Sequence, residues 1–416
     1  MQIAILGAGP SGCYMAQFLK RELPAAQIVI IDQLPTPYGL LRYGVAPDHV
    51  GTKQLTYQFS RQIERNQVDF LGHITVPDDL PLQEIEKNFD VLVCATGLSA
   101  DRKLGVPGEF LNGIWGSGKF IRFLNDHPLT SHANVFCGKE VIVVGNGNVA
   151  IDVLRMLAKT SLEFEGSELS EFSLRALNSD IPRVIHLIGR SAAHKAKFDV
   201  VMLKELQQLN SVEFSFAHSE TRKYLHAHID DPISATLLEL VEQQPKRTLK
   251  KVVFHFNSQI VSFEGEQVVQ GVVLREGAET SRVSRVSADT VITAIGYERE
   301  NNDVSSSVEK LSIPVFKAGW CATGPRGKIP DNRIQARELA QRIAVLQAQK
   351  SPSSKPGVAG IRAFLDKRNH IYTDYVDWKR IDEWEVRDAP KGRVRKKIRT
   401  IPKMLEVAKR KEVIKL

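Results

Sequence analysis

Met1-Gln-Ile-Ala-Ile-Leu-Gly-Ala-Gly-Pro-Ser-Gly12 opens the chain, and this stretch predicts its fold. Residues 1–6 form a short apolar run that suits a buried parallel strand. The glycines that follow have the spacing G-x-G-x-x-G, and residues 13–22 carry apolar side chains at helical spacing. A second apolar run ends in Asp32. Strand, glycine turn, helix, strand and acid together are the parts of a dinucleotide-binding βαβ unit.

Each part of this unit has a physical task. Gly7 permits a tight turn, Gly9 lets the backbone approach a pyrophosphate, and Gly12 lets the helix pack closely on the strand. The first turn of the helix, with Ser11, offers free N–H groups and a partial positive charge to phosphate. Asp32 is expected to accept hydrogen bonds from ribose hydroxyls.

The same theme recurs later in the chain. Residues 140–144 are an apolar run, and Gly145-Asn146-Gly147-Asn148-Val149-Ala150 follows as G-x-G-x-x-A before a helical segment. Alanine in the third position suits a nicotinamide-type site. Two such turns predict an α/β protein with two Rossmann-like dinucleotide-binding domains, and two dinucleotides bound face to face.

The strand after the second glycine turn distinguishes the two nucleotides. Val184–Ile188 ends in Gly189-Arg190-Ser191, without the acid that binds the ribose 2′-hydroxyl of NAD. Arg190 instead offers a planar guanidinium to a 2′-phosphate. The second site is therefore expected to take NADP(H).

Composition limits the remaining possibilities. The chain has 416 residues, 43% hydrophobic and 25% charged, which suits an ordinary globular protein of two domains. No apolar run is long enough for a membrane helix, and a strand at the start leaves no room for a targeting peptide. We expect a cytoplasmic protein without a membrane partner. None of the four cysteines forms a C-x-x-C pair, so we expect buried reduced thiols and no metal site.

The net charge of +8 indicates an acidic partner, either nucleic acid or an acidic protein. Much of the excess lies in the last stretch, but no nucleic-acid motif occurs there, so we expect a solvated basic tail and no nucleic-acid partner. The residues concerned are Lys391, Arg393, Arg395, Lys396, Lys397, Arg399, Lys409, Arg410 and Lys411.

A rigid apolar loop follows the first acid. Its segment Tyr38-Gly-Leu-Leu-Arg-Tyr-Gly-Val-Ala-Pro-Asp-His49 resembles the signature of the adrenodoxin-reductase-type ferredoxin–NADP reductases. The resemblance spans nearly the whole chain. It implies FAD in the first site and NADP(H) in the second, with the NADP domain inserted into the FAD domain. Domain ranges follow: 1–105 for the first part of the FAD domain, 106–317 for the NADP domain, 318–350 for the second FAD part, and 351–416 for a linker and C-terminal extension packing on the FAD domain.

The resemblance also implies the binding residues. Those expected at FAD are Gly7, Gly9, Ser11, Gly12, Asp32, Leu40, Val45, Ile74 beside the adenine, Ala95, Thr96, Gly97, Trp320, Gly327, Lys328 and Ile329. Those expected at NADP are Gly145, Asn146, Gly147, Asn148, Val149, Arg190, Ser191, Glu205 and Gly327. Three places depart from the family pattern: Ser191 replaces a second arginine, Lys328 replaces an apolar residue, and Pro330-Asp331 replaces the usual small residues.

The function implied is hydride transfer from NADPH to FAD, followed by single-electron transfer to an acidic ferredoxin or flavodoxin. Such a partner could feed a cytochrome P450 or another oxygenase, and a monomer or weak dimer is expected. His49 and Asp152 are implied neighbours, either as a proton relay or as a structural hydrogen bond. Two alternatives stay open: an electron-feeding subunit like that of glutamate synthase, and a cofactor-bound nucleic-acid-associated protein.

Overall fold

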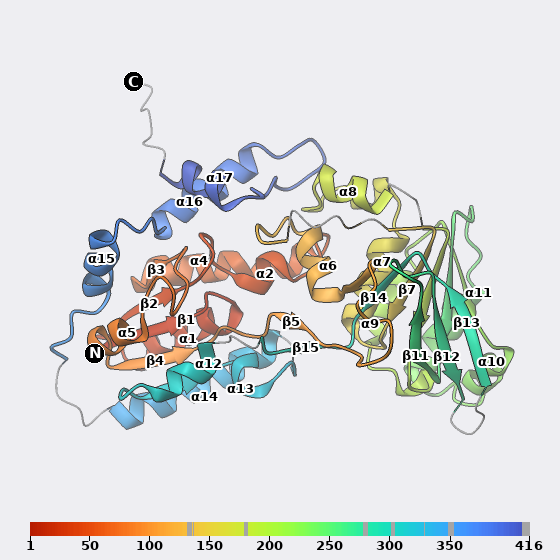
Figure 1. Ribbon diagram of the computed structural model, residues 1–416, viewed down its shortest axis with the longest axis horizontal. Helices are drawn as coiled ribbons and strands as arrows, with labels where there is room; N and C mark the ends of the chain where they lie inside the picture. The colour runs from red at the N-terminus through yellow and green to blue at the C-terminus, as the bar shows by residue number, and fades with distance from the viewer. Residues whose placement is uncertain are drawn as a thin grey trace. The chain divides into compact units, whose positions relative to one another are not determined.

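The computed structural model describes residues 1–130, 135, 137–178, 182–277, 282–300, 304–327, 329–347 and 353–409. The chain divides into two compact units (Figure 1). The first unit contains residues 1–100, 126–131 and 297–416, and the second contains residues 101–125 and 132–296. The units therefore change over near residues 100 and 297, whereas the sequence placed the crossings at 105 and 318.

The first unit is built on a parallel sheet with the strand order β16-β4-β1-β2-β3. Its strands are β1 (Gln2–Leu6), β2 (Gln27–Ile31), β3 (Asp69–Leu71), β4 (Val91–Cys94) and β16 (Val315–Lys317). Apolar side chains cover both of its faces, because alternate residues of a strand point to opposite sides. Ile3 and Ile5 belong to one buried cluster, and Ala4 and Leu6 belong to the other.

Helices cover each face of this sheet. The cluster with Ile3 includes side chains from α1 (Pro10–Glu22), α4 (Leu55–Asn66), α14 (Ile329–Gln347), α16 (Tyr375–Arg387) and α17 (Ile401–Ala408). The opposite cluster includes side chains from α5 (Leu82–Asn88), α15 (Val358–Lys367) and α12 (Val304–Ser307). Both faces are thus shielded from water, as in other parallel sheets.

The loop with the family signature is more ordered than the sequence indicated. It contains the short helices α2 (Gly39–Tyr43) and α3 (Val50–Lys53), while the sequence predicted an irregular loop. Within the range 351–416, predicted to hold a linker and the C-terminal extension, α15 begins at Val358. Two further short helices, η3 (Val308–Lys310) and α13 (Trp320–Thr323), lie on either side of β16 in the chain.

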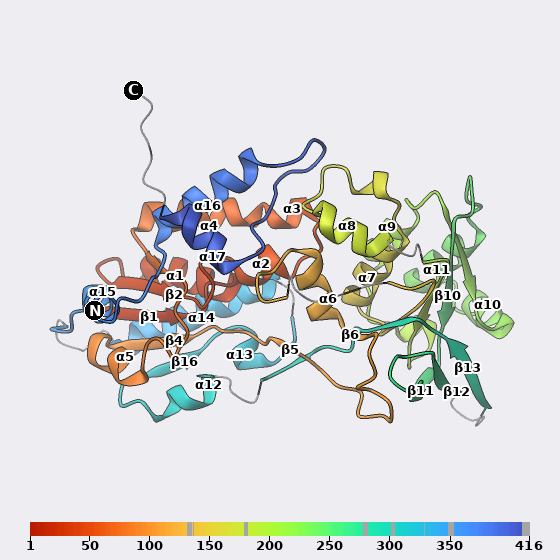
Figure 2. The ribbon, with the colours of Figure 1, turned by 45° about the horizontal axis from the view of Figure 1, so that its top comes forward.

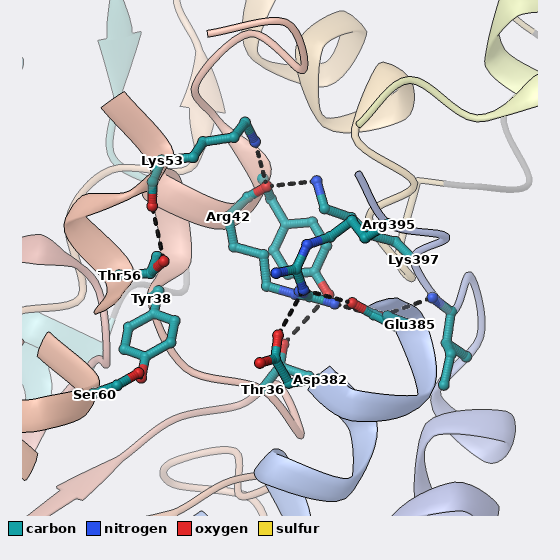
Figure 3. A network of polar contacts seen from close by, with 12 residues as sticks. Thr36, Tyr38, Arg42, Lys53, Thr56, Ser60, Asp382, Glu385, Arg395 and Lys397 are labelled. Carbon is teal, nitrogen blue, oxygen red and sulfur yellow. Dashed lines mark hydrogen bonds and ion pairs between the residues drawn. The ribbon is translucent and has the colours of Figure 1, made fainter. Parts of the chain in front are cut away.

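The expectation of a solvated basic tail is wrong for part of the described segment, because Lys391, Lys396 and Lys409 are exposed whereas Lys397 is buried. Lys397 is 3% exposed, and its Nζ donates to the carbonyl oxygen of Arg42 at 2.9 Å. The carboxylate of Glu385 in α16 contacts the guanidinium groups of both Arg42 and Arg395 (Figure 3). The basic side chains here bind the signature loop to the C-terminal extension, a role that charge composition alone does not reveal. Arg410 and Lys411 lie outside the described residues.

The second unit contains a six-stranded parallel sheet with the order β6-β14-β7-β8-β10-β9. Its strands are β6 (Ile114–Gly116), β7 (Glu140–Val144), β8 (Val184–Ile188), β9 (Val212–Phe216), β10 (Lys250–His255) and β14 (Thr290–Thr293). An antiparallel sheet of β11 (Ser258–Glu264), β12 (Gly271–Glu276) and β13 (Arg282–Ser287) accompanies it. The remaining strands, β5 (Ala100–Asp101) and β15 (Tyr297–Glu298), pair with each other.

The smaller sheet packs on the larger one. Ile142 and Ile188 of the parallel sheet share a buried cluster with Ile260 and Leu274 of the antiparallel sheet. Figure 2 labels β11, β12 and β13 next to one another in this unit. The helices of this unit are α6 (Ser117–Leu124), α7 (Asn148–Ala158), η1 (Ser161–Phe164), α8 (Glu171–Asn178), η2 (Ala193–Lys195), α9 (Val200–Leu206), α10 (Ser219–His226) and α11 (Pro232–Glu242). None of the helices in the described part of the chain combines the length and apolar character that a membrane crossing requires.

Candidate dinucleotide-binding sites

Distant segments of the first unit meet where β1 and β4 end. A Cβ added to Gly7 would lie 2.5 Å from the carbonyl oxygen of Ala95, and one added to Gly39 would lie 3.0 Å from the Cα of Gly9. A Cβ on Gly319 would lie 2.0 Å from the Oγ of Ser11. The first glycine turn, the signature loop, the segment after β4 and the segment after β16 therefore form one site at the carboxyl edge of the sheet, where α/β proteins bind ligands.

Two glycines of the first glycine turn, Gly12 and Gly9, differ in the space around them. A Cβ on Gly12 would lie 1.9 Å from the carbonyl oxygen of Gly7, so the fold itself requires this glycine. A Cβ on Gly9 would meet no described atom within 4 Å. Gly9 precedes α1, and none of the described side chains caps its first amides. Open space above unsatisfied N–H groups fits a phosphate group.

Asp32 holds the glycine turn in place. Its Oδ2 accepts a hydrogen bond from the amide of Ala8 at 2.7 Å, and its Oδ1 accepts one from the amide of Leu34 at 2.9 Å. Burial raises the pKa of Asp32, and these two hydrogen bonds oppose that shift. Each carboxylate oxygen has a second lone pair that can accept a further hydrogen bond. The predicted contact between Asp32 and a ribose is therefore compatible with this structural role, and it stays a prediction.

The signature loop offers a partly uncovered apolar surface. Leu41 and Tyr43 are buried in the protein, whereas Leu40 and Val45 are only half-buried. Two half-buried aliphatic side chains at this edge fit one face of a flat ring. Ile74 lies beyond the end of β3 at Leu71, and its side chain is fully buried. Its amide donates to the carbonyl oxygen of Asp32 at 3.0 Å, so its backbone still lies beside the acid.

The remaining first-site residues follow β4 and β16. Ala95 is buried, whereas Thr96 is exposed and Gly97 is half-buried, with no described atom within 4 Å of the place where a Cβ would lie. Trp320 is half-buried with its ring 5.4 Å from that of Tyr297, and its buried Nε1 has no hydrogen-bond partner among the described residues. An unpartnered buried donor fits a bound ligand. Gly327 is exposed, Ile329 begins α14, and Lys328 lies outside the described residues.

Two thiols lie together at this same edge of the sheet. Cys321 donates to the sulfur of Cys94 at 3.5 Å, and both side chains are buried. The hydrogen bond from Cys321, together with burial, raises the pKa of Cys94. All four cysteines are free and buried, which confirms the expected reduced thiols. The sequence could not reveal the pair, because its members follow different strands.

The second site repeats the geometry of the first. A Cβ on Gly145 would lie 2.3 Å from the carbonyl oxygen of Ala294, whereas one on Gly147 would meet no described atom within 4 Å. Gly147 precedes α7, whose first amides no described side chain caps. The side chain of Asn148 exchanges hydrogen bonds of 2.8 Å with Asp199. Val149 is exposed in the first helical turn and leaves an apolar surface beside the open glycine.

Arg190 and Ser191 have different surroundings. Arg190 is exposed at the end of β8 and can reach a ligand from the edge of the site. The Oγ of Ser191 accepts a hydrogen bond from the Nδ2 of Asn146 at 3.1 Å. The Oδ1 of that amide is buried without a hydrogen-bond partner among the described residues. Ser191 therefore orients a side chain of the glycine turn, a role that sequence reasoning missed.

A buried arginine joins two of the predicted site residues. Arg155 is 3% exposed, and its guanidinium contacts Asp152 Oδ1 at 2.9 Å and Glu205 Oε2 at 3.1 Å. Sequence reasoning missed Arg155, although an arginine in the apolar helix 151–158 was a signal. Asp152 and Glu205 thus act on a common partner in the second unit. His49 belongs to the first unit, where it is half-buried before α3.

The chain is similar to known proteins over nearly its whole length. A family profile described as pyridine nucleotide-disulphide oxidoreductase matches residues 1–336. The cindoxin reductase of Citrobacter braakii is 36% identical over an alignment that covers 98% of this chain and 91% of that protein. The mitochondrial NADPH:adrenodoxin oxidoreductase of Arabidopsis thaliana is 28% identical, with 92% of this chain and 90% of that protein covered.

A solved structure agrees on the fold. Mycobacterium tuberculosis FprA in complex with NADPH matches with a TM-score of 0.85 and 24% identity, covering 98% of this chain and 99% of that one. At this identity the match concerns the fold alone. It confirms the predicted α/β class with two dinucleotide-binding domains, one inserted into the other. The predicted resemblance to adrenodoxin-reductase-type enzymes is confirmed by the named relatives.

Proposed function

Because the chain belongs to the pyridine nucleotide-disulphide oxidoreductase family, we propose that it is an FAD-dependent reductase that passes electrons from NADPH to a ferredoxin-type protein. One observation carries the proposal. The chain has two glycine turns with open space at the central glycine, and one is followed by an acid and the other by an arginine. That difference supports two distinct nucleotides, one of them bearing a 2′-phosphate.

The residues of the first unit fit FAD. Gly9 and the first amides of α1, with Ser11, would hold the pyrophosphate, and Asp32 lies where a ribose is expected. Leu40 and Val45 would cover the flavin ring, and the loop with Trp320 would border it. Ile74, Ala95, Thr96, Gly97, Gly327, Lys328 and Ile329 remain proposed contacts. When bound, FAD accepts a hydride and releases electrons one at a time.

The residues of the second unit fit NADPH. Gly147 and the first amides of α7 would hold the pyrophosphate, with Gly145, Asn146, Asn148 and Val149 around it. Arg190 would bind the 2′-phosphate, while Arg155 holds Glu205 in position. Gly327 is proposed here as well as at FAD. No acid, base or nucleophile is required for hydride transfer itself, so the protein's task is to orient the two nucleotides and exclude water.

The electron acceptor is proposed from charge and from the relatives. An acidic ferredoxin or flavodoxin would be attracted by a protein of net charge +8 through long-range steering. We propose that this partner feeds a cytochrome P450 or another oxygenase. We also propose that the protein acts in the cytoplasm, as a monomer or weak dimer.

Anaerobic titration tests the function directly. NADPH should bleach the flavin absorbance of the purified protein at far lower concentration than NADH, and the reduced protein should then reduce an added ferredoxin. The rate of ferredoxin reduction should fall as ionic strength rises, because salt screens steering by charge. Protein purified without flavin absorbance would overturn the proposal. Flavin reduction without transfer to any ferredoxin or flavodoxin would favour the glutamate-synthase-like alternative.

Replacing Arg190 tests the nucleotide assignment. Arg190→Ala should raise the KM for NADPH by about 10- to 100-fold, because a hydrogen bond to a charged group contributes about 1.5–3 kcal/mol. The KM for NADH should not change, because NADH lacks the 2′-phosphate. Arg183→Ala is the matched control, since Arg183 is an exposed arginine immediately before the same strand. Equal effects on NADPH and NADH would contradict the assignment.

Replacing His49 tests the proposed proton relay with Asp152. His49→Ala should slow flavin reduction or ferredoxin reduction at least about tenfold. Proton transfer by a positioned side chain typically speeds a reaction by about 100-fold or more, so a tenfold loss is a conservative expectation. Stopped-flow absorbance measures both steps separately. Wild-type rates for both would leave His49 with a structural role only.

A further inference from the structure

Two imidazoles and one carboxylate meet in the second unit. His218 lies between β9 and α10, His255 ends β10, and Glu276 ends β12. One ligand atom from each of the three side chains lies within 4.8 Å of the other two. Figure 2 shows α10, β10 and β12 in the same part of this unit. Three segments that are far apart in sequence thus bring metal-ligating groups together.

The three converging atoms are buried. His218 Nε2, His255 Nδ1 and Glu276 Oε2 make no hydrogen bond within the part of the chain that the structure describes. His218 Nε2 lies 3.4 Å from Glu276 Oε2. Buried polar atoms without partners are costly. A cation between them would satisfy all three at once.

Neighbouring side chains orient two of these ligands. His186 Nδ1 lies 2.9 Å from His255 Nε2, so the neutral pair is satisfied when one of these nitrogens carries the proton. If His255 Nε2 donates, the lone pair of its Nδ1 is free to face the cluster. The hydroxyl of Ser284 donates to Glu276 Oε1 and leaves Oε2 toward the imidazoles. Metal-binding histidines and carboxylates are held by such outer hydrogen bonds.

The ligand set points to one class of metal. We propose that His218, His255 and Glu276 bind a divalent transition metal, with zinc as the best match. Two imidazole nitrogens and one carboxylate oxygen leave a fourth tetrahedral position open for water or another ligand. Calcium and magnesium prefer oxygen ligands throughout. The competing cation is Arg282, whose Nε lies 3.8 Å from Glu276 Oε2, but its side chain is 73% exposed and can turn into solvent.

The site adjoins the segment proposed to bind the 2′-phosphate. The carbonyl oxygen of His255 accepts a hydrogen bond from the amide of Gly189 at 2.8 Å, and the amide of Asn257 donates to the carbonyl oxygen of Ser191 at 3.1 Å. A metal on His255 would therefore stiffen the strand that holds this segment. The metal site itself does not depend on the role of Arg190.

Calorimetry with zinc chloride tests the site on the untagged full-length protein after removal of metals by EDTA. We expect one zinc ion per chain. His218→Gln and Glu276→Gln should each weaken binding by more than the 10- to 100-fold typical of outer-sphere changes. Glutamine at 276 removes only the charge, and His218 is partly exposed, so both variants should fold, as circular dichroism will check. X-ray absorption of bound zinc should show imidazole scattering.

His194→Gln is the matched control, because His194 belongs to a separate histidine–tyrosine stack in the same unit. Its zinc affinity should equal that of the wild type. The absence of zinc binding would overturn the proposal. Binding that survives in both His218→Gln and Glu276→Gln, or that His194→Gln abolishes, would place the zinc elsewhere and overturn it as well.

Discussion

Glu385→Gln is expected to lower the free energy of unfolding by about 3–5 kcal/mol, the loss seen when one partner of a buried ion pair is removed. The Glu385 side chain is fully buried, and that of Arg42 is 4% exposed. Oε1 contacts Arg42 Nη2 at 2.5 Å and also accepts the amide of Ile398 at 2.9 Å. Oε2 lies 3.2 Å from Arg395 Nη1 (Figure 3). Without the carboxylate, Arg42 remains buried and charged.

Calorimetric unfolding and urea titration measure the loss. Glu383→Gln is the matched control, because Glu383 is exposed on the same helix and its change should stay within about 0.5 kcal/mol. Arg395 keeps Asp382 as a partner at 2.7 Å, so Arg42 should account for most of the effect. The double variant Arg42→Gln/Glu385→Gln should therefore be less destabilised than the sum of the single variants. Equal stabilities for the 383 and 385 variants would contradict this reasoning.

This ion pair shows where reasoning from sequence ends. β1, β2 and β8 lie where the apolar runs predicted them. A buried strand and the glycine turn after it are formed by neighbouring residues, so their pattern can be recognised in the sequence. Arg42 and Glu385 are separated by 343 positions, and no local pattern pairs them. The error about Lys397 has the same origin. A run of basic residues predicts a solvated tail. That prediction fails where buried carboxylates and carbonyl oxygens elsewhere in the chain accept hydrogen bonds from these side chains.

The candidate sites divide in the same way. Gly9, Gly147 and Arg190 belong to motifs with a recognisable spacing. Their roles in nucleotide binding could therefore be predicted from the sequence. Arg155 was overlooked because its partners, Asp152 and Glu205, come together only when α7 packs beside α9. The histidines of the proposed metal site have no motif spacing at all. What the sequence lacks in each case is the geometry of contacts between distant segments.

Gly9→Ala and Gly147→Ala are expected to remove one nucleotide each without unfolding the protein. At both positions an added Cβ would meet no described atom within 4 Å, so the protein can accept alanine. The backbone there is extended, with φ −69° and ψ −178° at Gly9 and φ −115° and ψ 175° at Gly147. The methyl group would instead occupy the space that a pyrophosphate needs. Gly9→Ala should thus purify with little FAD, and Gly147→Ala should keep its FAD but need far more NADPH.

Flavin absorbance per chain and the KM for NADPH measure the two effects, and circular dichroism checks the fold. Gly51→Ala is the matched control, since a Cβ there also meets no described atom, but Gly51 is an exposed residue of α3, outside the glycine turn. Gly12→Ala gives the opposite comparison, because its Cβ would collide with the backbone of Gly7 and should impair folding itself. Each substitution should weaken binding of the nucleotide whose pyrophosphate lies at that glycine. If Gly9→Ala kept FAD but bound NADPH more weakly, the assignments of the two turns would have to be exchanged.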